Sequence, residues 1–426
     1  MPPMTDVPDP VDLPPAAARR ARAGLGLVFF VNGAAFASWV SRLPALREGL
    51  HLGDGALGSV LFALSAGVLL SFPLVGRGAR LLGARQLALL AGVLTLLLMP
   101  APYLVGIVPS LVLVMLELGM ANGGMQVAMN VLAVDVQARM ARPVISSLHG
   151  LWSAGGLVGA GLGSLAAHAG LPPAAHLVGM AGLLGFALVV AALLLARVPL
   201  APAARPRADE TAPARPLHGA DRVLVGLGVI CFCCFLVEGA MADWGAIWLR
   251  EKAGASESVA ALGYAVFAGA MTSMRLVGDR VVARFGPVRP LRVLTIAGTV
   301  ALAAALALAR VDATLIAFAT LGLGLATVVP SAFAAGARHA DARDGAAGDA
   351  PRARAIALVS GFGYTGLLLG PPVIGWLAQA TALRWALMLL VVLTAVIASL
   401  VSLLGDSWRP RRAPASCARR PLADPG

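Results

Sequence analysis

The sequence has little charge, and this shortage decides the broad class of the protein. Only 13% of its 426 residues are charged and 59% are hydrophobic, whereas soluble domains carry roughly 25% charged residues. The apolar residues also lie in runs of about 20, the length that a helix needs to cross a bilayer. The composition excludes an ordinary soluble domain and predicts an all-α polytopic membrane protein.

The sequence also lacks the motifs of cofactor and nucleotide chemistry. Three of its four cysteines, Cys231, Cys233 and Cys234, fall within one apolar run, without the paired spacing of a zinc site or a partner across a loop. We interpret them as small packing residues and expect no metal or other cofactor. No phosphate-binding loop, HExxH motif or nucleophile elbow occurs, so we expect neither an enzyme nor an ATP-driven pump.

Lysine is nearly absent, although the net charge is +12, since Lys252 is the only lysine among 33 basic residues. The arginines are scattered through short loops and do not gather on one face, which argues against a nucleic-acid partner.

The arginines instead orient the chain in a membrane. With the N-terminus inside, 27 of the basic residues fall on inner segments and six on outer loops, as the positive-inside rule requires. We therefore expect a multi-pass protein of the cell inner membrane with both termini in the cytoplasm. The expected spans are residues 22–40, 56–75, 86–105, 109–134, 146–168, 175–197, 222–242, 257–277, 290–309, 312–335, 355–379 and 384–405.

A Pro- and Arg-rich segment divides these spans into two sets of six. Residues 198–221 are interpreted as a cytoplasmic linker between bundles at 22–197 and 222–405. Cytoplasmic tails are expected at 1–21, predicted to be disordered, and at 406–426. The second and eighth spans open on similar stretches, LGSVLF and LGYAVF. Duplicated halves of six spans are typical of secondary transporters built from parallel repeats.

The fourth span carries three amide side chains, Asn122, Gln126 and Asn130. Their spacing of four residues places them on one stripe of a helix. A stripe that faces a water-filled cavity would suit hydroxyl-rich or zwitterionic solutes, because amides both donate and accept hydrogen bonds. The alternative is hydrogen bonding between helices. Glu117 lies about 180° from Gln126, so we expect it to be buried against a neighbouring span unless nearby glycines distort the helix.

Two further sets of polar residues are candidates for function. His149 and Trp152 begin the fifth span, where they either contact a solute or hydrogen-bond within the structure. Glu238 and Asp243 lie in the outer part of the seventh span, where an acid is costly unless it is paired or neutralised. Glu238 could couple protons, form a gate with Arg42 or Arg47 on the same outer side, or contact the solute; the remaining alternative is structural pairing.

Arg275 is expected at the inner end of the eighth span, too far along the membrane normal for a direct pair with Glu238 if the helices are straight.

The loops after the second and eighth spans resemble the inner-loop motif of the major facilitator superfamily, Gly-x-x-x-Asp-Arg-x-Gly-Arg. The first copy matches at Gly76, Gly83 and Arg85, with Arg80 in place of the Asp. The second copy matches at Arg284 and Gly286, with Gly278-Asp279-Arg280 just upstream. The motif is degraded, so the charge relay that it supplies in the family is not carried over intact.

A closer resemblance is to the MosC-like branch of that superfamily, relatives of the fucose permease. It rests on WVSRLPALRE (39–48), NGGMQVAMNVLAV (122–134), EGAMADWGAIWLR (238–250) and GFGYTGLLLGPPVIG (361–375). Where relatives carry an acid in span 4, this chain has Gln126, and its first span offers Asn32.

This resemblance implies a monomeric transporter in which two six-helix bundles rock about a midplane site. The solute would be small, polar and sugar-like, with protons as the coupling ion if there is one. Proton coupling would then run through Glu117 or Glu238. The alternative is a membrane sensor or assembly protein that keeps the fold without transporting.

Overall fold

The computed structural model describes residues 13–137, 139–140, 144–198, 221–286, 288–344 and 349–403. Within these ranges, twelve segments are long and apolar enough to cross a membrane, as the sequence predicts. The linker, apart from its ends, and the C-terminal tail lie outside the described residues.

The N-terminal half contains six spans. They are α1 (Pro15–Val40), α3 (Asp54–Leu82), α4 (Ala84–Leu98), α5 (Val108–Gln137), α6 (Ile145–His168) and α7 (Pro173–Ala196). Two short elements, α2 (Leu43–Gly49) and η1 (Ala101–Tyr103), lie between them.

The C-terminal half repeats this order. It comprises α8 (Arg222–Glu251), α9 (Glu257–Phe285), α10 (Val288–Leu308), α11 (Val311–Leu325), α12 (Val328–Asp344), α13 (Asp349–Ala380) and α14 (Leu383–Leu403). Helices α11 and α12 together form one span, Val311–Ala340.

Several of the predicted boundaries are wrong, among them the start of α1 and the end of α8. Helix α1 begins at Pro15, so residues 15–21 are helical and do not belong to a disordered tail. Proline fits the first turn of a helix because the N–H that it lacks has no partner there. Helix α8 continues to Glu251, well past the predicted end at residue 242, and it buries Trp244 and Trp248 in this extension. Because these two tryptophan side chains pack inside the protein, the helix extends beyond the expected span.

The break between α11 and α12 has a local cause. Pro330 has no N–H, so it cannot donate to the carbonyl of Ala326, four residues earlier. That carbonyl accepts instead a long hydrogen bond, 3.5 Å, from Nε of Arg275 on α9. At the break between α11 and α12, Arg275 of α9 is therefore hydrogen-bonded to the backbone of another span.

The two halves are related by pseudo-symmetry. In the first half α1 packs on α6 and α3 on α5, and in the second α8 packs on α13 and α9 on α11. Gly83 and Gly286 end α3 and α9, with φ of 82° and 76°. Only glycine adopts this region without strain. These two motif glycines thus terminate corresponding helices.

Close packing between helices depends on glycine at particular positions. On α6, a Cβ added at Gly159 would collide with the backbone of Ala34 on α1, whereas one added at Gly161 would meet open space. We expect Gly159→Ala to lower the unfolding temperature, since overpacking costs about 1–3 kcal/mol. Gly161→Ala should leave it unchanged or raise it. Thermal unfolding of the two variants in one detergent checks this, and equal behaviour would contradict the helix packing described.

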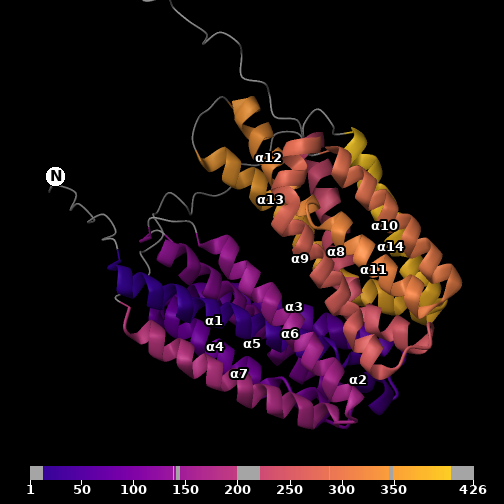
Figure 1. Ribbon diagram of the computed structural model, residues 1–426, viewed down its shortest axis with the longest axis horizontal. Helices are drawn as coiled ribbons and strands as arrows, with labels where there is room; N and C mark the ends of the chain where they lie inside the picture. Colours follow the sequence, from indigo (N-terminus) through magenta and orange to yellow (C-terminus); the bar gives the residue numbers. More distant parts are fainter. Residues whose placement is uncertain are drawn as a thin grey trace, which may run out of the picture.

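The two bundles converge at one end and diverge toward the other. In Figure 1 they meet beside α2 and separate toward the end where α1 begins. We call the meeting region the closed end: it comprises residues 42–59 and 164–172 of the first half and residues 250–258 and 371–379 of the second. Gly58 of α3 and Gly375 of α13 face each other there, and a Cβ on Gly58 would lie 2.9 Å from the Cα of Gly375.

Candidate functional site

Three of the predicted polar residues form one hydrogen-bonded cluster. Asn32 of α1 donates from Nδ2 to Oδ1 of Asn122 on α5 at 2.9 Å. Its own Oδ1 accepts from Nε1 of Trp152 on α6, also at 2.9 Å. Asn32 is fully buried, and its two hydrogen bonds fix the positions of the Asn122 and Trp152 side chains. The amides of Asn32 and Asn122 thus make the interhelical bonds that the sequence left as the alternative.

The rest of the amide stripe is more accessible. Gln126 and Asn130 are half-buried, and Nδ2 of Asn130 donates to the backbone carbonyl of Gln126 at 2.8 Å. His149 is exposed, and its ring meets that of Phe29 edge-on with 5.2 Å between centroids. Of the three amides, Gln126 keeps its side chain free of hydrogen bonds within the described residues.

The expectation that Glu117 is buried against a neighbouring span is wrong. Its side chain is exposed, and α5 is a continuous helix. Gly119 and Gly123 pack against α3 at Leu64 and Val68, while Asn122 faces α1. Glu117 therefore lies on the surface opposite Gln126, away from the amide stripe.

Glu238 and Arg275 lie close together, which corrects the expectation that they are too far apart. Glu238 is near the middle of α8, because that helix extends to residue 251. Nη2 of Arg275 on α9 lies 4.0 Å from Oε1 of Glu238, and the two side chains are 42% and 28% exposed. An ion pair within the membrane spans that is open on one side is a candidate functional site.

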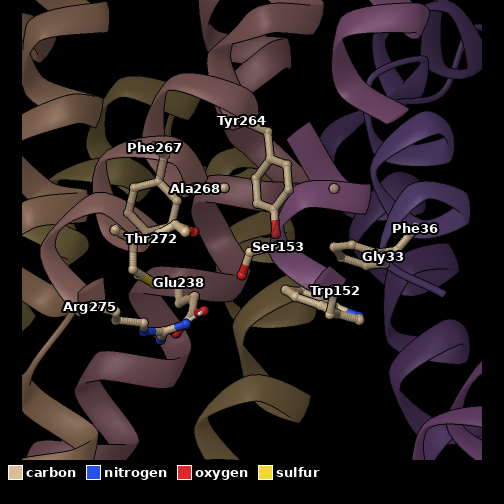
Figure 2. A pocket seen from close by; sticks show the side chains of 12 residues that line it. Gly33, Phe36, Trp152, Ser153, Glu238, Tyr264, Phe267, Ala268, Thr272 and Arg275 are labelled. Atoms are coloured by element: carbon tan, nitrogen blue, oxygen red, sulfur yellow. Dashed lines mark ion pairs between the residues drawn. The ribbon is translucent and has the colours of Figure 1, made fainter. Parts of the chain in front are cut away.

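The pair lines a pocket that both halves build. Figure 2 shows Glu238 and Arg275 on one side of it, Phe36 and Trp152 on the other, and Ser153 between them. The aromatic rings are packed: Phe36 stacks on Trp152 with centroids 6.5 Å apart and meets Tyr264 edge-on at 6.0 Å. The full lining is Gly33, Phe36, Trp152, Ser153, Gly156, Glu238, Tyr264, Phe267, Ala268, Met271, Thr272 and Arg275.

Asp243 lies five residues along α8 from Glu238 and does not share its setting. It is 9% exposed and makes no hydrogen bond or ion pair within the described part of the chain. Five residues correspond to about 140° around a helix, so the two acids face different neighbours and do not share a partner.

Arg42 and Arg47 do not pair with Glu238 in this structure, because each of them pairs with another acid. Arg42, 1% exposed, pairs with Glu257 of α9 at 3.3 Å. It also donates to the carbonyl of Leu171 at 2.7 Å. Arg47 pairs with Glu251 of α8 at 2.9 Å. Both acids belong to the second half, so these pairs join the two bundles.

Further contacts join the bundles at the same end. Arg250 pairs with Glu48 at 3.1 Å, and Ser164 of α6 donates to the carbonyl of Ser258 at 2.8 Å. On the α3–α13 side, Nε1 of Trp376 donates to the hydroxyl of Ser59 at 3.3 Å. The closed end is therefore held by ion pairs and hydrogen bonds between the halves, which can break and reform.

The inner-loop motif residues are placed at helix ends. Nη1 of Arg85 donates to the carbonyls of Leu195, at 2.9 Å, and Val198, at 3.3 Å, and so caps the end of α7. Gly76 and Arg280 are exposed, Gly278 is buried, and the guanidinium of Arg284 lies 5.5 Å from the Phe285 ring centroid. The side chain of Asp279 lies outside the described residues.

Sequence reasoning missed several pocket residues, namely Phe36, Ser153, Tyr264, Thr272 and, in its true position, Arg275. For Arg275 a signal existed, because it interrupts the apolar stretch MTSMRLVG, and arginine within a span is costly unless it serves a function. Ser153, Tyr264 and Thr272 carry no such signal. Only the packing of α6 against α9 brings them together.

Comparison with known proteins gives a consistent result. The family model described as Major Facilitator Superfamily matches residues 25–350. An uncharacterised MFS-type transporter of Yersinia pestis is 34% identical over 84% of this chain and 89% of its own length. The membrane protein MosC of Rhizobium meliloti is 28% identical over 87% and 86%.

Solved structures resemble the fold at low sequence identity. The nucleoside transporter NupG superposes with a TM-score of 0.65 at 14% identity, covering 92% of this chain and 100% of that one. A D-xylose–proton symporter superposes with a TM-score of 0.67 at 15% identity, over 91% and 96%.

Proposed function

Since the chain belongs to the major facilitator superfamily, we propose that it is a secondary active transporter of a small polar solute, working by alternating access. The observation that carries this proposal is the pocket shared by both halves, which contains Glu238, near the middle of α8, and Arg275 of α9. A solute bound there would contact both bundles and would respond to their relative motion.

The closed end supports the alternating-access part of the proposal. Its loops, residues 41–53 and 252–256, are those that the distribution of arginines assigns to the outside. The structure then corresponds to an inward-facing state, sealed outside by Arg42–Glu257, Arg47–Glu251 and Arg250–Glu48. We place the protein in the inner membrane as a monomer, with cytoplasmic termini.

Counterflow in proteoliposomes tests transport directly. Vesicles loaded with a library of neutral, anionic, cationic and zwitterionic metabolites are presented with the same solutes in labelled form. Exchange of any solute supports the proposal. A folded preparation that exchanges none of them would favour the alternative, a membrane sensor or assembly protein that keeps the fold.

Proton coupling is the second part of the proposal, with Glu238 as the proton carrier. An acid that alternates between pairing with Arg275 and binding a proton links protonation to the site. Glu238→Gln should therefore abolish accumulation driven by a proton gradient while counterflow remains measurable. Glu117→Gln is the matched control, since this exposed acid lies on the far face of α5. Accumulation that survives in Glu238→Gln would remove Glu238 from this role.

A further inference from the structure

Arg275 is a guanidinium whose hydrogen-bonding capacity is mostly unused. Of its five N–H donors, one makes the long bond to the carbonyl of Ala326. No other hydrogen bond to it occurs within the described residues, and at 4.0 Å the approach of Glu238 is too long for one. Its side chain is 42% exposed toward the pocket. These donors are therefore available to an acceptor that enters the pocket.

The backbone positions Arg275 and Glu238 so that the terminal nitrogens of Arg275 stay available to a ligand. Arg275 is anchored through Nε to the carbonyl that Pro330 leaves free, and Glu238 projects from the middle of a long, buried helix. Anchoring Nε leaves the two terminal nitrogens as the fork that remains available. A fork of this kind matches the two oxygens of a carboxylate.

We infer that the transported solute is a hydroxylated monocarboxylate whose carboxylate binds Arg275; this inference rests on the proposed transport function. Hydroxyl partners are available in the same pocket, from Ser153 of the first half and from Tyr264 and Thr272 of the second. Trp152 offers an apolar ring for the carbon skeleton. A neutral solute could accept hydrogen bonds from the guanidinium but would offer it no counter-charge, and a cation would be repelled by it.

The charges of Arg275 and Glu238 explain how the movement of the solute would be coupled to that of a proton. When the solute carboxylate takes Arg275, Glu238 loses the cationic partner that it has among the described residues and binds one proton from the solution that delivers the solute. Solute and proton then move together, and Arg275 returns to Glu238 when both leave. The titratable groups around this pair are Tyr264 of α9, Cys234 of α8 and His149 of α6, which is subject to the charge of Arg275.

The test compares carboxylates with neutral solutes of the same skeleton. Purified protein is exposed to D-gluconate and D-sorbitol, to D-galacturonate and D-galactose, and to the cation D-galactosamine, with thermal stabilisation and counterflow as readouts. We expect the two carboxylates to bind best. Equal or tighter binding of the neutral partners or the amine would overturn the inference while leaving transport intact. Absence of exchange by any solute in the full library would instead reject transport itself.

Variants of Arg275 test whether this residue binds the solute carboxylate. Arg275→Gln should weaken carboxylate binding by about 10- to 100-fold, the usual loss of hydrogen bonds to a charged group. Arg275→Lys should lose less, because it keeps the charge without the fork. Arg289→Gln is the matched control, an exposed arginine outside the pocket. Unchanged affinity in Arg275→Gln would overturn the assignment. If that variant does not fold, the wild-type solute pairs decide alone.

Glu238→Gln should change the affinity for the carboxylate in the opposite direction from Arg275→Gln. It removes the competitor for Arg275, so carboxylate binding should become tighter and lose its dependence on pH. Weaker binding in this variant would overturn the exchange of partners, since it would mean that Glu238 itself holds the solute.

Discussion

Gly375→Leu is expected to abolish transport and leave the protein folded. A Cβ on Gly375 would lie 2.6 Å from the Cα of Gly58 and 2.7 Å from the carbonyl oxygen of Asp54, closer than real Cβ contacts. These neighbours are backbone atoms of α3, which cannot rotate away as a side chain can. Overpacking costs about 1–3 kcal/mol and here falls at the upper end, so closure should become roughly 100-fold less favourable.

The contact lies between the halves, and this is why folding should survive. When the closed end opens, α3 and α13 move apart and leave room for the leucine side chain, so the variant should accumulate in the outward-facing state. Counterflow measures the loss of transport, and labelling of a cysteine introduced in the outer vestibule measures the shift of state.

Gly361→Leu is the matched control for this prediction. It places the same side chain on the same helix, at a position where a Cβ meets nothing within 4 Å. Normal counterflow by Gly375→Leu would mean that α3 and α13 do not approach as closely during transport as they do in this structure.

Glu257→Gln is expected to give the second-largest effect, by releasing the closed end. Arg42 is 1% exposed and Glu257 is 35% exposed, so removing the acid leaves a buried guanidinium without its counter-charge. Breaking a buried pair costs about 3–5 kcal/mol; because Glu257 is partly solvated we expect about 2–3 kcal/mol. The equilibrium should shift toward the outward-facing state by roughly 30- to 150-fold.

The structure offers a matched control for this pair too. Arg250 and Glu48 join the same two halves at the same end, with side chains 38% and 53% exposed. Exposed pairs contribute about 0–1 kcal/mol, so Glu48→Gln should change transport little. Replacing both members of the buried pair, as in Arg42→Met with Glu257→Gln, should restore part of the activity, because no unpaired buried charge remains. Equal effects of Glu48→Gln and Glu257→Gln would contradict a gate based on burial.

Much of this fold could be predicted from the sequence because membrane helices are local in their physics. Each span must satisfy its own backbone hydrogen bonds in lipid, so the apolar runs mark the helices without reference to their neighbours. The exceptions are instructive. Helix α8 continues to Glu251 because Trp244 and Trp248 pack inside the protein, and inward packing leaves no mark on the length of an apolar run.

The candidate site, too, could be predicted from the sequence only in part, and the tertiary structure decided the rest. Composition, the alternation of arginines between loops and the repeated halves determined by themselves that this is a twelve-span protein with two halves of six spans, and the resemblance of its inner loops and of four stretches implied the major facilitator superfamily. The family stretches contain Asn122 and Glu238, whereas Asn32 and Trp152 were candidates because they are polar residues within the first and fifth spans. Tertiary structure alone decided which of them face the pocket: Asn32 is buried behind Trp152, and Glu117 lies outside.

Tertiary structure also supplied the partner of Glu238. A straight-helix estimate of depth separated Arg275 from Glu238, but α8 is longer than its apolar run, and Arg275 is held at the carbonyl that Pro330 frees. Sequence determines which residues can enter the membrane, because that cost is set residue by residue. Which of them meet is decided by how tilted, kinked and extended helices pack.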